Sequence, residues 1–290
     1  MKCFDQTYFN DIKYRVFVPP LILRPYITRY IIYQHPLNVS QNICLRALPN
    51  GKIELFIHLR ESYIGFREKG RYSIASHFAA GIFDLEYPMK IEIGCSGKPF
   101  KGLSVTFTHM GVNKYFNRPL FEFTNRIHEV ALLWGNKGMS VIQKITQAPN
   151  DMVRITLLNQ FFLEHVHEKN HLEQRDIYPV LNWLEHTSGR ITVDELAQKL
   201  SISYKSIYRK FIYHIGLTPK TYLKIIRFNK ACKLLNQLPK LSWSELAYFC
   251  GYYDQAHFIN EFHAIMKTSP KKFLQETNGN FYLNRPFSFR

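Results

Sequence analysis

Polar and apolar positions follow the same order twice between residues 191 and 273. A hydroxyl residue, then Glu three positions later, then Leu-Ala, occurs at residues 192–197 and again fifty positions later at 242–247. This spacing opens helices, because the hydroxyl and the Glu satisfy each other's free backbone amides. Further caps, apolar positions and a Ser/Thr-Pro-Lys sequence recur at an offset of 51. We interpret the stretch as a duplicated supersecondary unit.

Each copy predicts a helix, a tight turn and a second helix, with units at 192–215 and 242–266. Ser203 is expected to cap the second helix of the first copy, and Asp254 that of the second copy. Gly216 follows the first of these helices, where a left-handed residue is favoured. A tight turn between two short helices is typical of helix-turn-helix motifs. Two ordinary helical hairpins in an all-α domain fit the same pattern.

Between the copies, Thr218 and Pro219 predict the start of a linker helix over about 219–236, which Pro239 ends. Apolar positions at Ile177, Leu181 and Leu184 predict an earlier helix that begins this helical domain.

Residues up to about 108 predict strands, because short runs rich in β-branched and aromatic residues alternate with turn signals. The runs are 27–33, 43–48, 52–59, 74–83, 89–94 and 103–107. Asn50-Gly51 between two of them predicts a hairpin turn. We expect a small, mostly-β barrel or sandwich with flanking helices.

A helix is expected over residues 108–123, and another over 151–167 with one apolar stripe. That stripe fits packing on its own β-rich domain or a dimer-forming helix. Polar residues 168–175 predict a boundary, which gives a β-rich regulatory domain at 1–170 and a helical domain at 171–290. The fold class is therefore α+β.

Charge favours a nucleic-acid partner for the helical part. The formal net charge is +16, and residues 199–240 hold ten Lys or Arg and no acid. A membrane surface would also attract this charge, but Gly216, Pro219 and Pro239 break the interval into short helices. No stretch is long and apolar enough to span a bilayer.

Cysteine and histidine positions do not predict a metal centre. The five cysteines are scattered without a CxxC pair, which indicates a reducing, cytoplasmic location. His165, His167 and His171 cluster near the boundary, but they have no carboxylate motif and fit a hydrated helix end better. We expect no cofactor and no catalytic motif.

Two sets of residues in the last hundred positions form a recognisable pattern: residues 194–197 with Ser203, Arg209 and Phe211, and Gly251-Tyr252-Tyr253-Asp254-Gln255 with Phe258 and Phe262. In this pattern the stretch resembles the AraC/XylS family of transcription regulators. Residues 48–55 and Gly81 carry a weaker likeness to the β-rich domain of a subgroup. The resemblance implies two helix-turn-helix units on one rigid helix, promoter binding and contact with RNA polymerase.

The first recognition helix carries most of the predicted DNA contacts. With Ile207 and Phe211 facing the core, the outward residues include Tyr204, Lys205, Ser206, Tyr208 and Arg209. The resemblance places Lys205, Tyr208 and Arg209 where base readers lie. A solvated lysine remains an alternative for Lys205, and an ion pair with Glu195 for Arg209. Lys220 is a predicted phosphate contact.

The second recognition helix is expected to bind DNA more weakly. Gln255, His257 and Asn260 face outward, and Lys271 beyond it can hold a phosphate. Asn260 and His263 stand where the family usually has arginine and lysine. Glu261 adds an acid, which we expect phosphates to repel.

The sequence therefore predicts a sequence-specific, DNA-binding transcription regulator, an activator by resemblance. Its expected partners are promoter double-stranded DNA, RNA polymerase, a small-molecule effector and a second copy in a homodimer. A non-specific architectural DNA binder and an enzyme targeted to DNA by its helical domain are the alternatives.

Overall fold

The computed structural model describes residues 3–7, 13–34, 43–46, 51–59, 63–68, 71–75, 77–80, 90–94, 101–166, 177–187, 189–238 and 240–277. The chain divides into two compact units, one drawn mainly from residues 1–173 and the other mainly from residues 174–290. The predicted turn at Asn50, Gly81 and the polar boundary lie wholly or largely outside the described residues.

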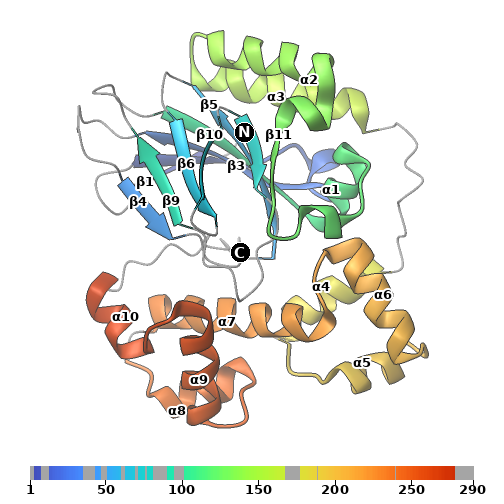
Figure 1. Ribbon diagram of the computed structural model, residues 1–290, viewed down its shortest axis with the longest axis vertical. Helices are drawn as coiled ribbons and strands as arrows, with labels where there is room; N and C mark the ends of the chain where they lie inside the picture. The colour runs from blue at the N-terminus through green and yellow to red at the C-terminus, as the bar shows by residue number, and fades with distance from the viewer. Residues whose placement is uncertain are drawn as a thin grey trace. The chain divides into compact units, whose positions relative to one another are not determined.

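The first unit contains two antiparallel sheets (Figure 1). The larger has the order β1 (Cys3–Thr7), β2 (Lys13–Phe17), β3 (Ile27–Gln34), β10 (Lys101–Phe107), β5 (Ile53–His58), β8 (His77–Ala80) and β11 (Ile127–Glu129). The smaller has the order β4 (Ile43–Arg46), β9 (Lys90–Gly94), β6 (Tyr63–Glu68) and β7 (Arg71–Ala75).

The α+β organisation is confirmed, but of the two expected architectures, barrel or sandwich, the described strands do not form a closed barrel. β1 and β11 are the two edges of the larger sheet, and no pairing between them joins the described strands into a closed ring. Closure is one way to bury a sheet face, and here helices cover a face instead. The single strand expected over 74–83 is wrong, because β7 and β8 belong to different sheets.

Helices follow β10 in the first unit. They are α1 (His109–Phe116), the 3-10 turn η3 (Leu120–Phe123), α2 (Val130–Gln147) and α3 (Asp151–His165), and a further turn, η2 (Leu21–Leu23), precedes β3. The helix expected over 108–123 is split. Thr108 caps α1, with its hydroxyl accepting from the Gly111 amide at 3.0 Å, and Asn117 ends it in a left-handed conformation at φ 48°.

β10 lies in the middle of the larger sheet and is buried on both faces. Leu103, Val105 and Phe107 point to one side, where the Phe107 ring meets those of Phe116 and Phe162 at 5.1 and 5.7 Å between centroids. Ser104 and Thr106 point to the other side and are also buried. The helices therefore cover one face of the sheet, and the opposite face combines buried polar side chains with apolar ones, since Ile31 and Phe56 lie beside Ser104.

The apolar stripe of α3 packs on the first unit itself. Leu158 and Phe162 are fully buried, and the Tyr30 hydroxyl of β3 donates to Asn159 at 2.8 Å. The intramolecular alternative therefore accounts for most of the stripe. Met152 and Val153 remain exposed, and the dimer role of this helix stays a prediction.

Helices make up the described part of the second unit from residue 177 onward. They are α4 (Ile177–Thr187), α5 (Val193–Lys199), α6 (Tyr204–Ile215), α7 (Pro219–Gln237), α8 (Trp243–Cys250), α9 (Gln255–Met266) and α10 (Pro270–Thr277). Figure 1 shows α4, α5 and α6 at one end of the long α7, and α8, α9 and α10 at its other end. The two predicted helix-turn-helix units and their linker helix are confirmed.

Asp151 joins α3 to the larger sheet through a buried ion cluster. Its carboxylate accepts from Arg15 of β2, lies 2.6 Å from the Lys101 Nζ of β10 and 2.9 Å from Arg154 Nη1. Burial tends to raise the pKa of Asp151, but Lys101, Arg15 and Arg154 outweigh it and the pKa is lowered. The carboxylate is thus held ionised in the fold.

We expect Asp151→Asn to destabilise the first unit by about 2–4 kcal/mol, because three cations lose their shared buried partner. The pKa of Asp151 is depressed in the folded protein. Its contribution to the free energy of unfolding is therefore fully present above the ordinary aspartate pKa of about 4, and it is lost as pH falls through the lower folded pKa. Hydrogen exchange of β10 and α3 peptides at several pH values measures it. Glu122→Gln, which removes the partly exposed pair with Arg118, is the control and should change little. Equal effects of both variants would contradict this role.

Candidate nucleic-acid interface

Both predicted capping boxes are present, and they mark the first residues of the two helix-turn-helix units. Thr192 accepts from the Glu195 amide at 3.2 Å and donates its own amide to that carboxylate at 2.7 Å. Ser242 and Glu245 repeat the arrangement at 3.2 and 2.9 Å. These hydrogen bonds lower the pKa of both carboxyl groups. Glu195 is therefore engaged at its cap, and its expected alternative pairing with Arg209 is not among the ion pairs of the described residues.

α6 buries one side and exposes a cationic and aromatic side. Ser203 caps it by accepting from the Ser206 amide at 3.2 Å, and Gly216 ends it at φ 79°. Ile207, Phe211 and Ile215 are fully buried. Lys205 and Arg209 lie one turn apart on the exposed side, together with Tyr204, Tyr208 and the partly buried Ser206.

α9 begins in the same way but presents a different surface. Asp254 caps it by accepting from the His257 amide at 2.7 Å. Phe258 and Phe262 are fully buried, as expected. Gln255, His257 and Asn260 are exposed, but the first two are already engaged. Ser244 donates to Gln255 Oε1 at 2.9 Å, and the ring of His257 accepts from the Tyr253 amide at 3.3 Å.

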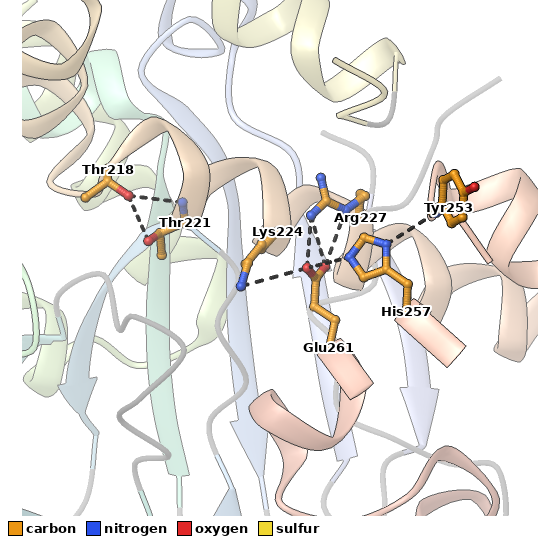
Figure 2. A network of polar contacts seen from close by, with 7 residues as sticks. All are labelled: Thr218, Thr221, Lys224, Arg227, Tyr253, His257 and Glu261. Carbon is orange, nitrogen blue, oxygen red and sulfur yellow. Dashed lines mark hydrogen bonds and ion pairs between the residues drawn. The ribbon is translucent and has the colours of Figure 1, made fainter. Parts of the chain in front are cut away.

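The position of Glu261 corrects the expectation that it faces phosphates. Its side chain is only 4% exposed and lies against α7, where Arg227 binds its carboxylate (Figure 2). A carboxylate is buried only when charge and hydrogen bonds compensate it, and Arg227 supplies both. Arg227 is consequently committed to this pair, and the linker helix offers one free cation fewer than its sequence suggests.

A signal for this buried acid exists in the sequence. Phe258, Phe262 and Ile265 define the inner face of α9, and Glu261 falls on the same face at three residues from Phe258. An acid at an apolar position predicts a buried cation nearby. Nothing in the periodicity identifies Arg227 as that cation, since 34 positions separate the two residues.

Arg190 lies in the loop that precedes α5 and contacts the second helix-turn-helix unit. The sequence analysis does not predict this role. Its guanidinium donates to the Tyr248 carbonyl near the end of α8 and lies 5.2 Å from the centre of the Tyr248 ring. Gly251 ends α8 at φ 81°, and a methyl group there would collide with Arg190 Cγ. Gly251 therefore serves both the helix end and the close approach of Arg190.

The remaining predicted contacts lie at separate places on the helical unit. Lys220 is exposed in the first turn of α7, and Lys271 is exposed in α10. Ser269 and Pro270 begin α10, as Thr218 and Pro219 begin α7, so the repeated Ser/Thr-Pro sequence starts a helix in both copies.

The described residues contain no group of three His, Cys, Asp or Glu arranged to hold a metal ion. His165 pairs with the Phe161 carbonyl at 2.6 Å, whereas His167 and His171 lie outside the described residues. Cys232 and Cys250 are buried core residues, as expected, and burial raises the pKa of the Cys250 thiol to about 12. None of the helices that the structure describes is long and apolar enough to cross a bilayer.

Comparison with known proteins identifies the class of the helical unit. Residues 196–276 match the family model described as a helix-turn-helix domain. A segment of 101 residues is 35% identical to the HTH-type transcriptional activator RhaS of Shigella boydii and 34% identical to RhaS of Escherichia coli. The match spans 34% of this chain and 36% of each relative. Residues 196–276 of the C-terminal unit are thus a helix-turn-helix domain, in agreement with the resemblance to the AraC/XylS family.

Solved structures show weaker likenesses. ToxT of Vibrio cholerae, in its apo K231A form, aligns over 85% of this chain and 97% of its own at 12% identity and a TM-score of 0.47. The DNA-binding domain of AdpA, in complex with a target DNA, aligns over 35% of this chain and 92% of its own at 25% identity and a TM-score of 0.33. Scores at this level are too low to decide function.

We expect Gly251→Ala to destabilise the second helix-turn-helix unit by more than the about 1–2 kcal/mol that a left-handed residue costs alone, because Arg190 must also move. Hydrogen exchange of α8 and α9 peptides measures the loss. The control is Gly251→Ala in an Arg190→Ala background, where the left-handed backbone cost remains but the collision with Arg190 Cγ is removed. An equal loss from Gly251→Ala in both backgrounds would show that Arg190 contributes no steric constraint.

Proposed function

We propose that this protein is a transcription regulator that binds specific promoter sequences through its C-terminal unit. The observation that carries the proposal is the exposed face of α6, where Lys205, Tyr208 and Arg209 stand on a helix whose opposite side is fully buried. A helix of this kind fits the major groove, where base edges differ. Arg209 and Lys205 have no ion-pair partner among the described residues, so their charges are available to DNA.

Each predicted contact has its own role in this proposal. Arg209 can place a bidentate fork on guanine, while Lys205 suits guanine or phosphate. Tyr204, Ser206 and Tyr208 add hydrogen-bonding groups beside them, and Lys220 and Lys271 contact phosphates. Gln255, His257 and Asn260 face the second segment of the site. Gln255 and His257 are less available than Asn260, because Gln255 Oε1 and the His257 ring each already accept a hydrogen bond.

The broader assignment rests on the likeness to RhaS, which covers about a third of that relative. Activation of transcription, contact with RNA polymerase and a cytoplasmic location belong to this proposal. It also takes residues 1–170 as a regulatory domain and 171–290 as the DNA-binding domain. A homodimer is a further part of it, for which the exposed Met152 and Val153 of α3 offer an apolar surface.

A small-molecule effector for the first unit completes the proposal. Arg29, Ser104 and Thr106 are buried on the sheet face opposite the helices, and Thr106 donates to Glu54 at 3.2 Å. A few polar side chains on an otherwise buried surface are the kind of groups that orient a small polar ligand. Screening of polar metabolites for slowed hydrogen exchange in β3 and β10 tests this part separately.

Selection from random double-stranded DNA tests sequence recognition. We expect the full chain to enrich a two-part motif with segments about one helical turn apart. Arg209→Ala should weaken binding to that motif by about 1–3 kcal/mol and relax preference at one position, while Lys220→Ala should lower the salt slope by about one. Equal affinity for selected and random DNA would instead support the architectural binder. A stoichiometric metal in the purified protein would favour the enzyme.

We expect the two halves of the selected site to be read unequally. α9 lacks an exposed Lys or Arg at the positions equivalent to Lys205 and Arg209, so base changes in its segment should cost less than changes in the α6 segment. Asn260→Ala should reduce affinity by less than Arg209→Ala in the same binding assay. A larger loss for Asn260→Ala would contradict this asymmetry.

A further inference from the structure

Glu261 lies at the centre of a polar network that joins α9 to the linker helix α7. Arg227 places its Nη2 3.0 Å from Oε2 and 3.2 Å from Oε1, and its Nε 3.3 Å from Oε1. Lys224, one turn earlier on α7, has its Nζ 4.0 Å from Oε2 (Figure 2). The three contacts of the Arg227 guanidinium fix both the distance and the orientation of Glu261 relative to α7. Apolar contacts between two helices do not constrain orientation in this way.

The network continues from Glu261 to the beginning of α9. His257, one turn before Glu261, has Nε2 3.6 Å from Oε2, and its Nδ1 accepts from the Tyr253 amide. Figure 2 shows these residues as one chain of contacts from Arg227 to the turn before α9. Tyr253 in that turn is 92% exposed. The N-terminal end of α9 is therefore held from α7 through Glu261.

A second contact attaches α8 to the loop that precedes α5. Arg190 holds the end of α8, and the neighbouring Gly189 packs closely on α7, since a carbon added there would lie 3.1 Å from the Leu223 carbonyl. The ring of Tyr252, between α8 and α9, lies 5.5 Å below the Arg227 guanidinium. α8 and α9 are thus both attached to the middle of the helical unit by directional contacts.

We propose that Glu261 is a positioning residue for DNA recognition, which fixes α9 relative to α7 and so sets one spacing between the two recognition helices. The inference rests on the proposed function. It gives a role to the second helix-turn-helix unit, whose recognition helix α9 has no Lys or Arg. This helix-turn-helix unit selects the distance between the two DNA segments. One added base pair separates the segments by about 3.4 Å and rotates them by about 35°, which a fixed pair of helices cannot follow.

The test compares DNA affinities of the full chain for the selected site, for the same site with one base pair inserted between its segments, and for its α6 segment alone. Wild type should lose affinity on insertion by about ten-fold or more, within the range of coupling between sites. Glu261→Gln should lower affinity for the selected site and remove most of the insertion penalty. Its affinity for the α6 segment alone should change less than about two-fold, because that segment does not use the coupling.

Two further variants separate positioning from charge and from folding. Asp194→Asn removes an exposed acid on α5 and changes net charge equally, and it should keep the wild-type insertion penalty. Arg227→Lys keeps the charge but loses the fork, and it should behave like Glu261→Gln.

An unchanged insertion penalty in Glu261→Gln and Arg227→Lys would overturn the inference while leaving the proposed function intact. Equal losses on all three DNAs would overturn it as well, since they indicate general damage. Absence of any selected site for wild type would instead overturn the proposed function.

Discussion

The helical unit depends on α7 being shared by two cores. Phe228, Ala231 and Cys232 of α7 enter the same buried cluster as Phe258 and Phe262, and nearer its start Tyr222 packs on Phe211 at 5.8 Å between ring centroids. Helices of seven to twelve residues are marginal in water by themselves. Each pair of short helices is therefore stable only against α7. Because one helix completes both cores, the two recognition helices are parts of one packed body.

Two buried carboxylates perform the same physical task in different parts of the chain. Asp151 ties α3 to β2 through Arg15 and to β10 through Lys101, and Glu261 ties α9 to α7 through Arg227. A buried ion pair adds little net stability compared with apolar packing, but breaking it leaves a costly unpaired charge. The free-energy cost of such a pair in a misaligned packing is therefore larger than its net stabilisation of the correct packing. Both pairs lie where a helix must meet its neighbour in one register.

The internal contacts of the helical unit reduce the number of its Lys and Arg side chains that are available to DNA. The excess of Lys and Arg suggests a uniformly cationic helical unit, yet Arg227 is neutralised by Glu261, and Arg190 is occupied by the end of α8. The exposed side of α6 retains Lys205 and Arg209, whereas α9 presents Gln255, His257 and Asn260. The two copies share their caps, their buried positions and the Pro that begins the next helix. Their outward residues differ, which suits contact with DNA through one copy and alignment through the other.

The sequence by itself determined the duplicated helical pairs, both capping boxes, the linker helix and the outward residues of α6, because these depend on neighbours within four positions and on helical periodicity. It also indicated the strands around β10. Only the tertiary structure decided that the larger sheet stays open, that residues 74–83 divide between two sheets, and that Arg227 is the cation that meets Glu261. Each of these depends on partners far away in the chain. Local pattern shows which side of a helix is buried, but the residue that meets a buried charge is chosen by how the helices pack.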